Sequence, residues 1–165
     1  MSNRRLLAEL MSYATRKGKD QLQRAVCNEP NMKMLRVASD VHGGDNVAVS
    51  IETPLHSYYH LEVNPEGVVV DGNPGPSWKS LVEVKTERGD DHWRVQLRIP
   101  VVGEVEANSD PKHRVAGVKP TAEKPWYFNV GRSRVLNFDQ PELQAFSPIR
   151  GGWHLPEKFG KLHTK

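Results

Sequence analysis

The sequence of 165 residues has little cysteine and no long apolar run. Its single cysteine, Cys27, cannot form a disulfide within the chain and fits no zinc-binding Cys or Cys/His pattern. No stretch approaches the roughly 18 apolar residues that span a membrane. We therefore expect a fold held by an apolar core, which a domain of this size can build without disulfides or a structural metal.

Motifs of the common enzyme classes are also missing. The chain contains no nucleophile elbow, HExxH, P-loop or GxGxxG motif. A glycosidase needs two carboxylates roughly 5–10 Å apart, and the pairs Glu62 with Glu83 and Glu104 with Glu106 leave that alternative open. We expect a protein that is not an enzyme.

The basic charge is concentrated at one end of the chain. The net charge is +3 overall, but residues 1–36 hold eight lysines and arginines against three acidic residues, a net of +5. Residues 37–165 hold 15 against 17, a net of −2. Nucleic-acid contact through the basic segment is an alternative that we do not expect, and its mark would be an affinity that falls steeply with salt.

Apolar residues in the basic segment recur at spacings of three and four, which predicts two short amphipathic helices at about 4–16 and 20–27. Pro30 prevents the second from continuing. Because Glu9 interrupts the first apolar run, that run lacks the core of a signal peptide, and we expect no export signal. The residues that carry the spacing are Leu6, Leu7, Leu10, Met11, Ala14, Leu22, Ala25 and Val26.

Beyond this helical segment, assigned to 1–33, the apolar period changes to two, and we assign 34–165 to a β-domain. Alternation of this kind predicts half-buried strands of an antiparallel sheet. The apolar alternates are Val47, Val49 and Ile51, then Tyr59, Leu61 and Val63, then Trp93, Val95, Leu97 and Ile99.

Turn residues complete the fold prediction. The sequence Asn64-Pro65-Glu66-Gly67 has proline and glycine where a type I turn favours them, which predicts a hairpin over 58–71. Further strands are predicted at 81–86 and 126–132, and loops at 102–125 and 137–160. The expected fold is mainly β, an antiparallel β-sandwich with a short N-terminal helical segment.

Four segments of the β-domain then carry a resemblance: 58–67 (YYHLEVNPEG), 93–100 (WRVQLRIP), 126–132 (WYFNVGR) and 154–162 (HLPEKFGKL). In this order they resemble the carbohydrate-binding modules of the ninth family, a β-sandwich group related to the DOMON domains. The resemblance implies sugar binding without catalysis, often beside a glycosidase domain that acts on xylan or cellulose. It also implies a sugar held between two tryptophans, structural calcium, and an extracellular or periplasmic location.

The chain departs from the family pattern at several positions. Residues 39–44 contain no aromatic where relatives have a tryptophan, so half of the aromatic sandwich is missing. Ala48 stands at the position of a carboxylate, and Phe146 stands where tryptophan is common. The basic segment replaces additional β-strands of the relatives.

Two tryptophans are candidates for stacking on a sugar ring, whose apolar face packs on aromatics. Trp153 follows two glycines that would let its loop present the ring, and packing on the sheet is the alternative. Trp78 lies in a proline-rich loop and is a candidate for the missing partner.

Polar candidates come from two predicted strands. Arg132 and Asn129 could bind sugar hydroxyls, with a salt bridge from Arg132 to Glu62 or another acid as the alternative. Tyr58, His60 and Glu62 share one strand face, which is either a binding or a solvated surface.

We expect a saccharide ligand, with a glycosidase domain as a further partner, and neither a membrane nor a cofactor. Structural calcium stays open: Asp40, Asp45, Asp90 and Asp91 offer oxygen ligands without EF-hand spacing, and plain acidic turns are the alternative. The other open function is a DOMON-like structural or interaction domain without sugar affinity.

Overall fold

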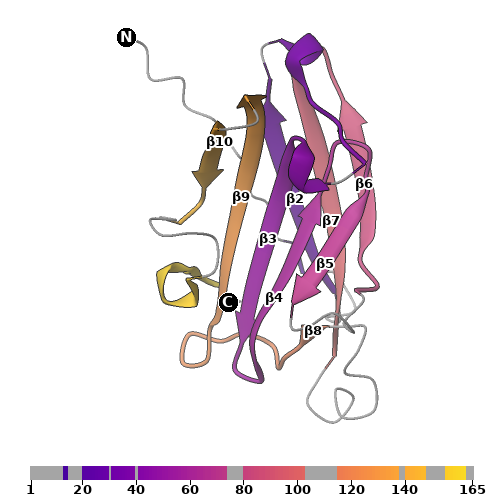
Figure 1. Ribbon diagram of the computed structural model, residues 1–165. Helices are drawn as coiled ribbons and strands as arrows, with labels where there is room; N and C mark the ends of the chain where they lie inside the picture. Colours follow the sequence, from indigo (N-terminus) through magenta and orange to yellow (C-terminus); the bar gives the residue numbers. More distant parts are fainter. Residues whose placement is uncertain are drawn as a thin grey trace.

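The computed structural model describes residues 13–14, 20–29, 31–39, 41–73, 80–102, 115–137, 140–147 and 155–162. In these residues two β-sheets pack as layers, which confirms the predicted β-sandwich (Figure 1). A five-stranded sheet has the order β1-β2-β7-β6 with β8 beside β7, and a six-stranded sheet has the order β10-β9-β3-β4-β5 with β11 beside β9. All strand pairs are antiparallel except β7 with β8.

The strands are β1 (Tyr13–Ala14), β2 (Asp20–Asn28), β3 (Asn46–Thr53), β4 (His56–Val63), β5 (Val69–Asn73), β6 (Glu83–Arg88), β7 (His92–Val102), β8 (Val115–Ala116), β9 (Trp126–Asn137), β10 (Gln140–Ala145) and β11 (Gly160–Leu162). Three short 3-10 helices are η1 (Met32–Met34), η2 (Val41–Gly43) and η3 (Pro156–Lys158). Among these residues, no helix is long and apolar enough to cross a membrane.

The core lies between the two sheets. Successive side chains of a strand point to opposite faces, and the predicted alternates of β3, β4 and β7 are all in the core. Trp93 and Trp126 are 0% and 1% exposed. The buried cluster consists of Cys27, Val47, Val49, Ile51, Tyr59, Leu61, Val63, Trp93, Val95, Leu97, Ile99, Val115, Trp126, Phe128 and Val130.

The predicted turn between β4 and β5 is confirmed. The backbone N–H of Gly67 donates to the carbonyl of Asn64 at 3.0 Å. The side-chain oxygen of Asn64 accepts from the N–H groups of Glu66 and Val68. Gly67 has a φ of +81°, a conformation that glycine adopts without a steric penalty.

The helix predicted over 20–27 is wrong, because these residues belong to strand β2. The strand pairs with β7 over its whole length, from Asp20 opposite Pro100 to Asn28 opposite His92. Pairing with β7 stabilises the extended conformation of these residues, and this tertiary interaction overrides their weak local helical pattern. Of the helix predicted at 4–16, residues 13 and 14 form β1, and the others lie outside the described residues.

The loop predicted over 137–160 is also wrong in part, because it contains β10, the edge strand beside β9. Pro141 and a register shift between Gln140 and Glu142 make this strand irregular. Both features interrupt the regular alternation from which a strand is predicted.

A buried ion cluster joins the two sheets at one end. Glu29, directly after β2, is fully buried and accepts from Arg132 at 3.1 Å and from Arg134 Nη2 at 2.6 Å, both on β9. Asp45 is also fully buried and accepts from the N–H of Val135 at 2.7 Å. Burial raises the pKa of Glu29, but the hydrogen bonds and charge of Arg134 outweigh burial and leave that pKa below its ordinary value.

Glu29→Gln should lower the free energy of unfolding by about 3 kcal/mol or more, because it leaves two guanidinium groups without their shared carboxylate. The stability that Glu29 contributes is present above the ordinary carboxyl pKa and is lost as the pH falls through its lowered value. Urea unfolding at pH 7 and pH 4 measures both effects. Glu83→Gln, which breaks the exposed pair with Arg98, is the control and should cost under about 1 kcal/mol. An equal cost in the two variants would contradict the role of the cluster.

Cys27 should be chemically inert in the folded protein. Its side chain is 2% exposed, and burial raises its pKa to about 12, with a smaller opposing effect of Arg132. The thiolate is the reactive form, so a disulfide reagent at pH 8 should modify Cys27 only as fast as the protein unfolds. Rapid native-state labelling would show that the core at this point opens without global unfolding.

Candidate functional site

Polar side chains form rows on the outward face of the six-stranded sheet. The register aligns Asn129, Ser50 and His60 in one row across β9, β3 and β4. Because their neighbours along each strand point into the core, this row faces away from it. In the adjacent row Glu62 lies opposite Ala48. The structure thus brings together three of the predicted site residues, His60, Glu62 and Asn129.

A chain of hydrogen bonds runs across this face. Ser50 Oγ lies 2.9 Å from His60 Nδ1, and His60 Nε2 lies 3.0 Å from Glu62 Oε1. The second carboxylate oxygen of Glu62 lies 3.0 Å from His42 Nδ1. Burial falls along the chain: Ser50 is 2% exposed, whereas the side chain of Glu62 is 15% and that of His42 is 61% exposed. The hydrogen-bonded residues are therefore increasingly exposed from Ser50 through Glu62 to His42.

His42 reaches Glu62 from η2, in the segment before β3. The side-chain amide of Asn46 donates to the Val41 carbonyl at 3.0 Å and holds the turn. A Cβ atom at Gly44 would lie 2.9 Å from the backbone oxygen of Arg36, so the close return of the chain requires glycine there. In Figure 1 this turn lies in front of β3 and β4, on the outward face.

Glu62 is the ionised centre of the site. Partial burial raises its pKa, but the hydrogen bond from His60 and the positive charge that His42 can carry outweigh burial. The pKa of Glu62 is therefore below its ordinary value. A carboxylate held ionised by two imidazoles is a strong acceptor for hydroxyl groups.

Asn129 has a structural partner. Its side-chain oxygen accepts from the N–H of Ser147 at 2.9 Å, and its amide group donates to the carbonyl of Ser147 at 3.5 Å. Asn129 and Ser147 are both buried. This pair of bonds fixes the chain after β10 against β9.

Arg132, the remaining polar candidate from β9, is not brought together with Glu62. It lies on the opposite face of the sheet, is 4% exposed, and is bonded to Glu29 between the sheets. The alternative of a salt bridge therefore describes its contact, with Glu29 as the acid.

The predicted aromatic residues cannot be placed on this face. Trp78 and Trp153 lie outside the described residues. Tyr58 has its backbone in β4, but its side chain is also outside the description. Their roles in binding stay predictions.

His42 is the site residue that the sequence does not reveal. The residues Val41-His42-Gly43-Gly44 have no period and no motif. Two glycines after a histidine and just before a predicted strand are the one available sign of a close turn. The departure from the family pattern at Ala48 also lies at this site, because the strand register places Ala48 directly opposite Glu62.

Structural calcium stays a prediction. No group of three or more His, Cys, Asp or Glu among them could hold a metal ion. Asp45 lies in the ion cluster with Arg132, and Asp91 Oδ1 pairs with His92 at 2.7 Å. Asp40 lies outside the description.

The glycosidase alternative loses one of its carboxylate pairs. Glu62 is on the outward face of the six-stranded sheet, whereas Glu83 belongs to the other sheet and pairs with Arg98 there. Glu104 and Glu106 lie outside the described residues.

Comparison with solved structures shows which class of protein has this fold. The chain is similar to a carbohydrate-binding module of family 9 from Caldicellulosiruptor kristjanssonii in complex with glucose, with a TM-score of 0.64 and 16% identity over 89% of this chain and 71% of that one. A carbohydrate-binding module of family 9 from the same organism, in complex with cellotriose, gives a TM-score of 0.62 and 16% identity over 87% of this chain and 68% of that one.

A third structure, of a candidate carbohydrate-binding protein from Bacteroides uniformis, gives a TM-score of 0.63 and 17% identity over 94% of this chain and 85% of that one. No family model matches the sequence, and no curated protein matches it. The chain thus has the β-sandwich fold of family 9 carbohydrate-binding modules, as the sequence resemblance predicted.

Asn129→Ala should lower the free energy of unfolding by about 1–3 kcal/mol, because it leaves the backbone groups of buried Ser147 without their partner. Chemical denaturation measures the change. Ser133→Ala, at a half-buried position on the same face of β9, is the matched control and should change stability by about 0.5 kcal/mol or less. A similarly small effect at Asn129 would show that its bonds to Ser147 are not made in solution.

Proposed function

We propose that the protein binds saccharides on the outward face of its six-stranded sheet and does not itself catalyse a reaction. The observation that carries this proposal is Glu62, a partly exposed carboxylate whose two oxygens are each bonded by a histidine. Glu62 is the ionised group among the polar side chains on the outward face of the sheet. The inward face of the same sheet forms part of the core.

The chemistry of the face suits sugar hydroxyls. A hydroxyl both donates and accepts, an ionised carboxylate only accepts, and an imidazole does either according to its tautomer. Ala48, directly opposite Glu62, has only a methyl group as its side chain and is 4% exposed, so it supplies no polar group of its own. Glu62 therefore offers, from the neighbouring strand, the carboxylate that the family pattern would have at position 48.

The fold supports the same ligand class. Two of the similar structures are of a family 9 module in complex with glucose and with cellotriose. Apolar faces of the sugar rings would stack on Trp153 and Trp78, which we propose as the aromatic part of the site. Asn129 supports the site by fixing the chain after β10.

The biological setting that we propose is xylan or cellulose breakdown, with this chain as an accessory to a glycosidase domain. Binding without catalysis would then keep the catalytic partner at its polymer and raise its effective concentration there.

Titration with glucose, cellotriose and xylotriose should quench tryptophan fluorescence, and calorimetry should give the affinity. Glu62→Gln should weaken binding about tenfold or more, because it removes a charge-assisted hydrogen bond. Trp153→Ala should abolish the fluorescence response while circular dichroism shows an intact fold. Affinity should stay constant between low and high salt, unlike phosphate-directed binding.

Glu83→Gln is the matched control, since Glu83 lies on the other sheet and should not affect binding. The absence of binding to any sugar in a broad glycan screen would overturn the proposal and favour a structural or interaction domain.

A further inference from the structure

Both carboxylate oxygens of Glu62 are hydrogen-bonded, and each has capacity for a further hydrogen bond. Each oxygen of an ionised carboxylate can accept about two hydrogen bonds. One imidazole nitrogen lies 3.0 Å from each oxygen, His60 Nε2 on one and His42 Nδ1 on the other. Each oxygen thus keeps the capacity to accept one further donor, and the partly exposed side chain gives such donors access.

The two histidines are built differently. His60 is on the same strand as Glu62, is buried, and is itself bonded to Ser50. His42 belongs to η2, which the sheet holds through the bond from Asn46 to Val41. The contact with His42 therefore links the second carboxylate oxygen of Glu62 to another element. Together with the hydrogen bond from His60, it holds the carboxylate in one orientation.

A fixed carboxylate is a directional acceptor. Two adjacent hydroxyls of a sugar ring can donate to its two oxygens side by side, in the same way that a planar guanidinium donates to a carboxylate. Because the side chain is already ordered before the ligand arrives, binding costs less conformational entropy.

Few charges compete for Glu62. On the neighbouring strands it lies opposite Ala48 of β3 and Val70 of β5, neither of which titrates. Among the described residues, the titratable groups bonded to it are His60 from β4 and His42 from η2. The hydrogen bonds and charges of these two imidazoles both lower the pKa of Glu62.

We propose that His42 is a positioning residue that fixes Glu62 as a two-oxygen acceptor for a vicinal diol of the sugar, and that it thereby sets the acid limit of binding. The inference rests on the proposed saccharide function and deepens it. It assigns the ligand class as neutral sugars with two adjacent free hydroxyls.

The first test needs no ligand. The pKa of Glu62 is followed by NMR of its side-chain carboxyl in the wild type, in His42→Ala and in His42→Asn. We expect His42→Ala to raise this pKa, because the hydrogen bond and the charge of His42 are lost while those of His60 remain. His42→Asn retains a donor near the place of Nδ1 but no charge, and should give an intermediate titration.

The second test measures cellotriose affinity from pH 3.5 to 8. His42→Ala should weaken binding about threefold to tenfold at pH 7 and move the acid loss of binding to higher pH. His42→Asn should restore most of the affinity at pH 7. Because the side chain of His42 is 61% exposed, neither variant should unfold the protein.

His92→Ala is the matched control, since His92 forms the same kind of pair with Asp91 in the turn between β6 and β7. His92→Ala should change neither the pKa of Glu62 nor the affinity for cellotriose. An unchanged titration of Glu62 in His42→Ala would overturn the positioning role.

A panel of monodeoxyglucoses tests the diol. Removal of either hydroxyl of one adjacent pair should weaken binding, and equal affinity for every monodeoxy sugar would overturn the diol assignment. If the wild type binds no sugar at all, both the proposed function and the diol assignment are wrong. The NMR titration still decides whether His42 lowers the pKa of Glu62.

Discussion

The pleat of the six-stranded sheet divides each of its central strands into two environments. On β3, β4 and β9, one set of alternate residues packs against the other sheet, and the second set faces outward. Ser50, His60 and Glu62 can form their chain because the apolar residues between them fix the strands in a single register. A slip of one residue would exchange the core for the site, so the packing of the core and the alignment of the polar face have one common cause.

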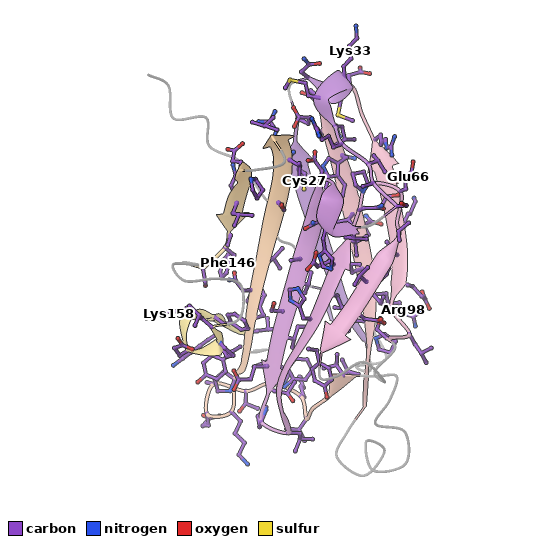
Figure 2. The ribbon with its side chains drawn as sticks, viewed as in Figure 1. Cys27, Lys33, Glu66, Arg98, Phe146 and Lys158 are labelled. Carbon is purple, nitrogen blue, oxygen red and sulfur yellow. The ribbon has the colours of Figure 1, made fainter. Side chains whose placement is uncertain are left out.

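The same constraint explains Arg132. The alternation of β9 carries this arginine into the interior, where an unpaired charge would be costly. Glu29 supplies the opposite charge from the end of β2, and Arg134 shares that carboxylate. Cys27, labelled in the upper half of Figure 2, belongs to the buried core between the two sheets. The two sheets are thus joined by apolar contacts along their length and by a charge cluster at one end.

Sequence patterns predict the parts of this structure that repeat or that have turn chemistry. The alternates around Val49, Leu61 and Leu97 are all buried, and the turn at Asn64 forms as expected, because each signal is local. The strand β2 was hidden because its spacing also fits a helix, and only its pairing with a strand far along the chain decides between them. His60 and Glu62 could be predicted as neighbours on one strand, but His42 could not, because a turn without a period brings it there. A salt bridge from Arg132 to an acid could be predicted as an alternative to sugar binding, but the identity of that acid could not, since Glu29 is about a hundred residues away in sequence.

The pairing of β2 with β7 has a consequence for how the chain is made. β2 leaves the ribosome well before β7, the strand that pairs with it along its whole length and begins at His92. Until then its amide and carbonyl groups remain open to water or to other chains, and the loop that must close is long, which slows the pairing. The pairing of β2 in the five-stranded sheet is therefore delayed until β7 has been synthesised. The six-stranded sheet waits longer still for β9, so the row that includes Asn129 and the ion cluster around Glu29 can both form only after β9 has been synthesised.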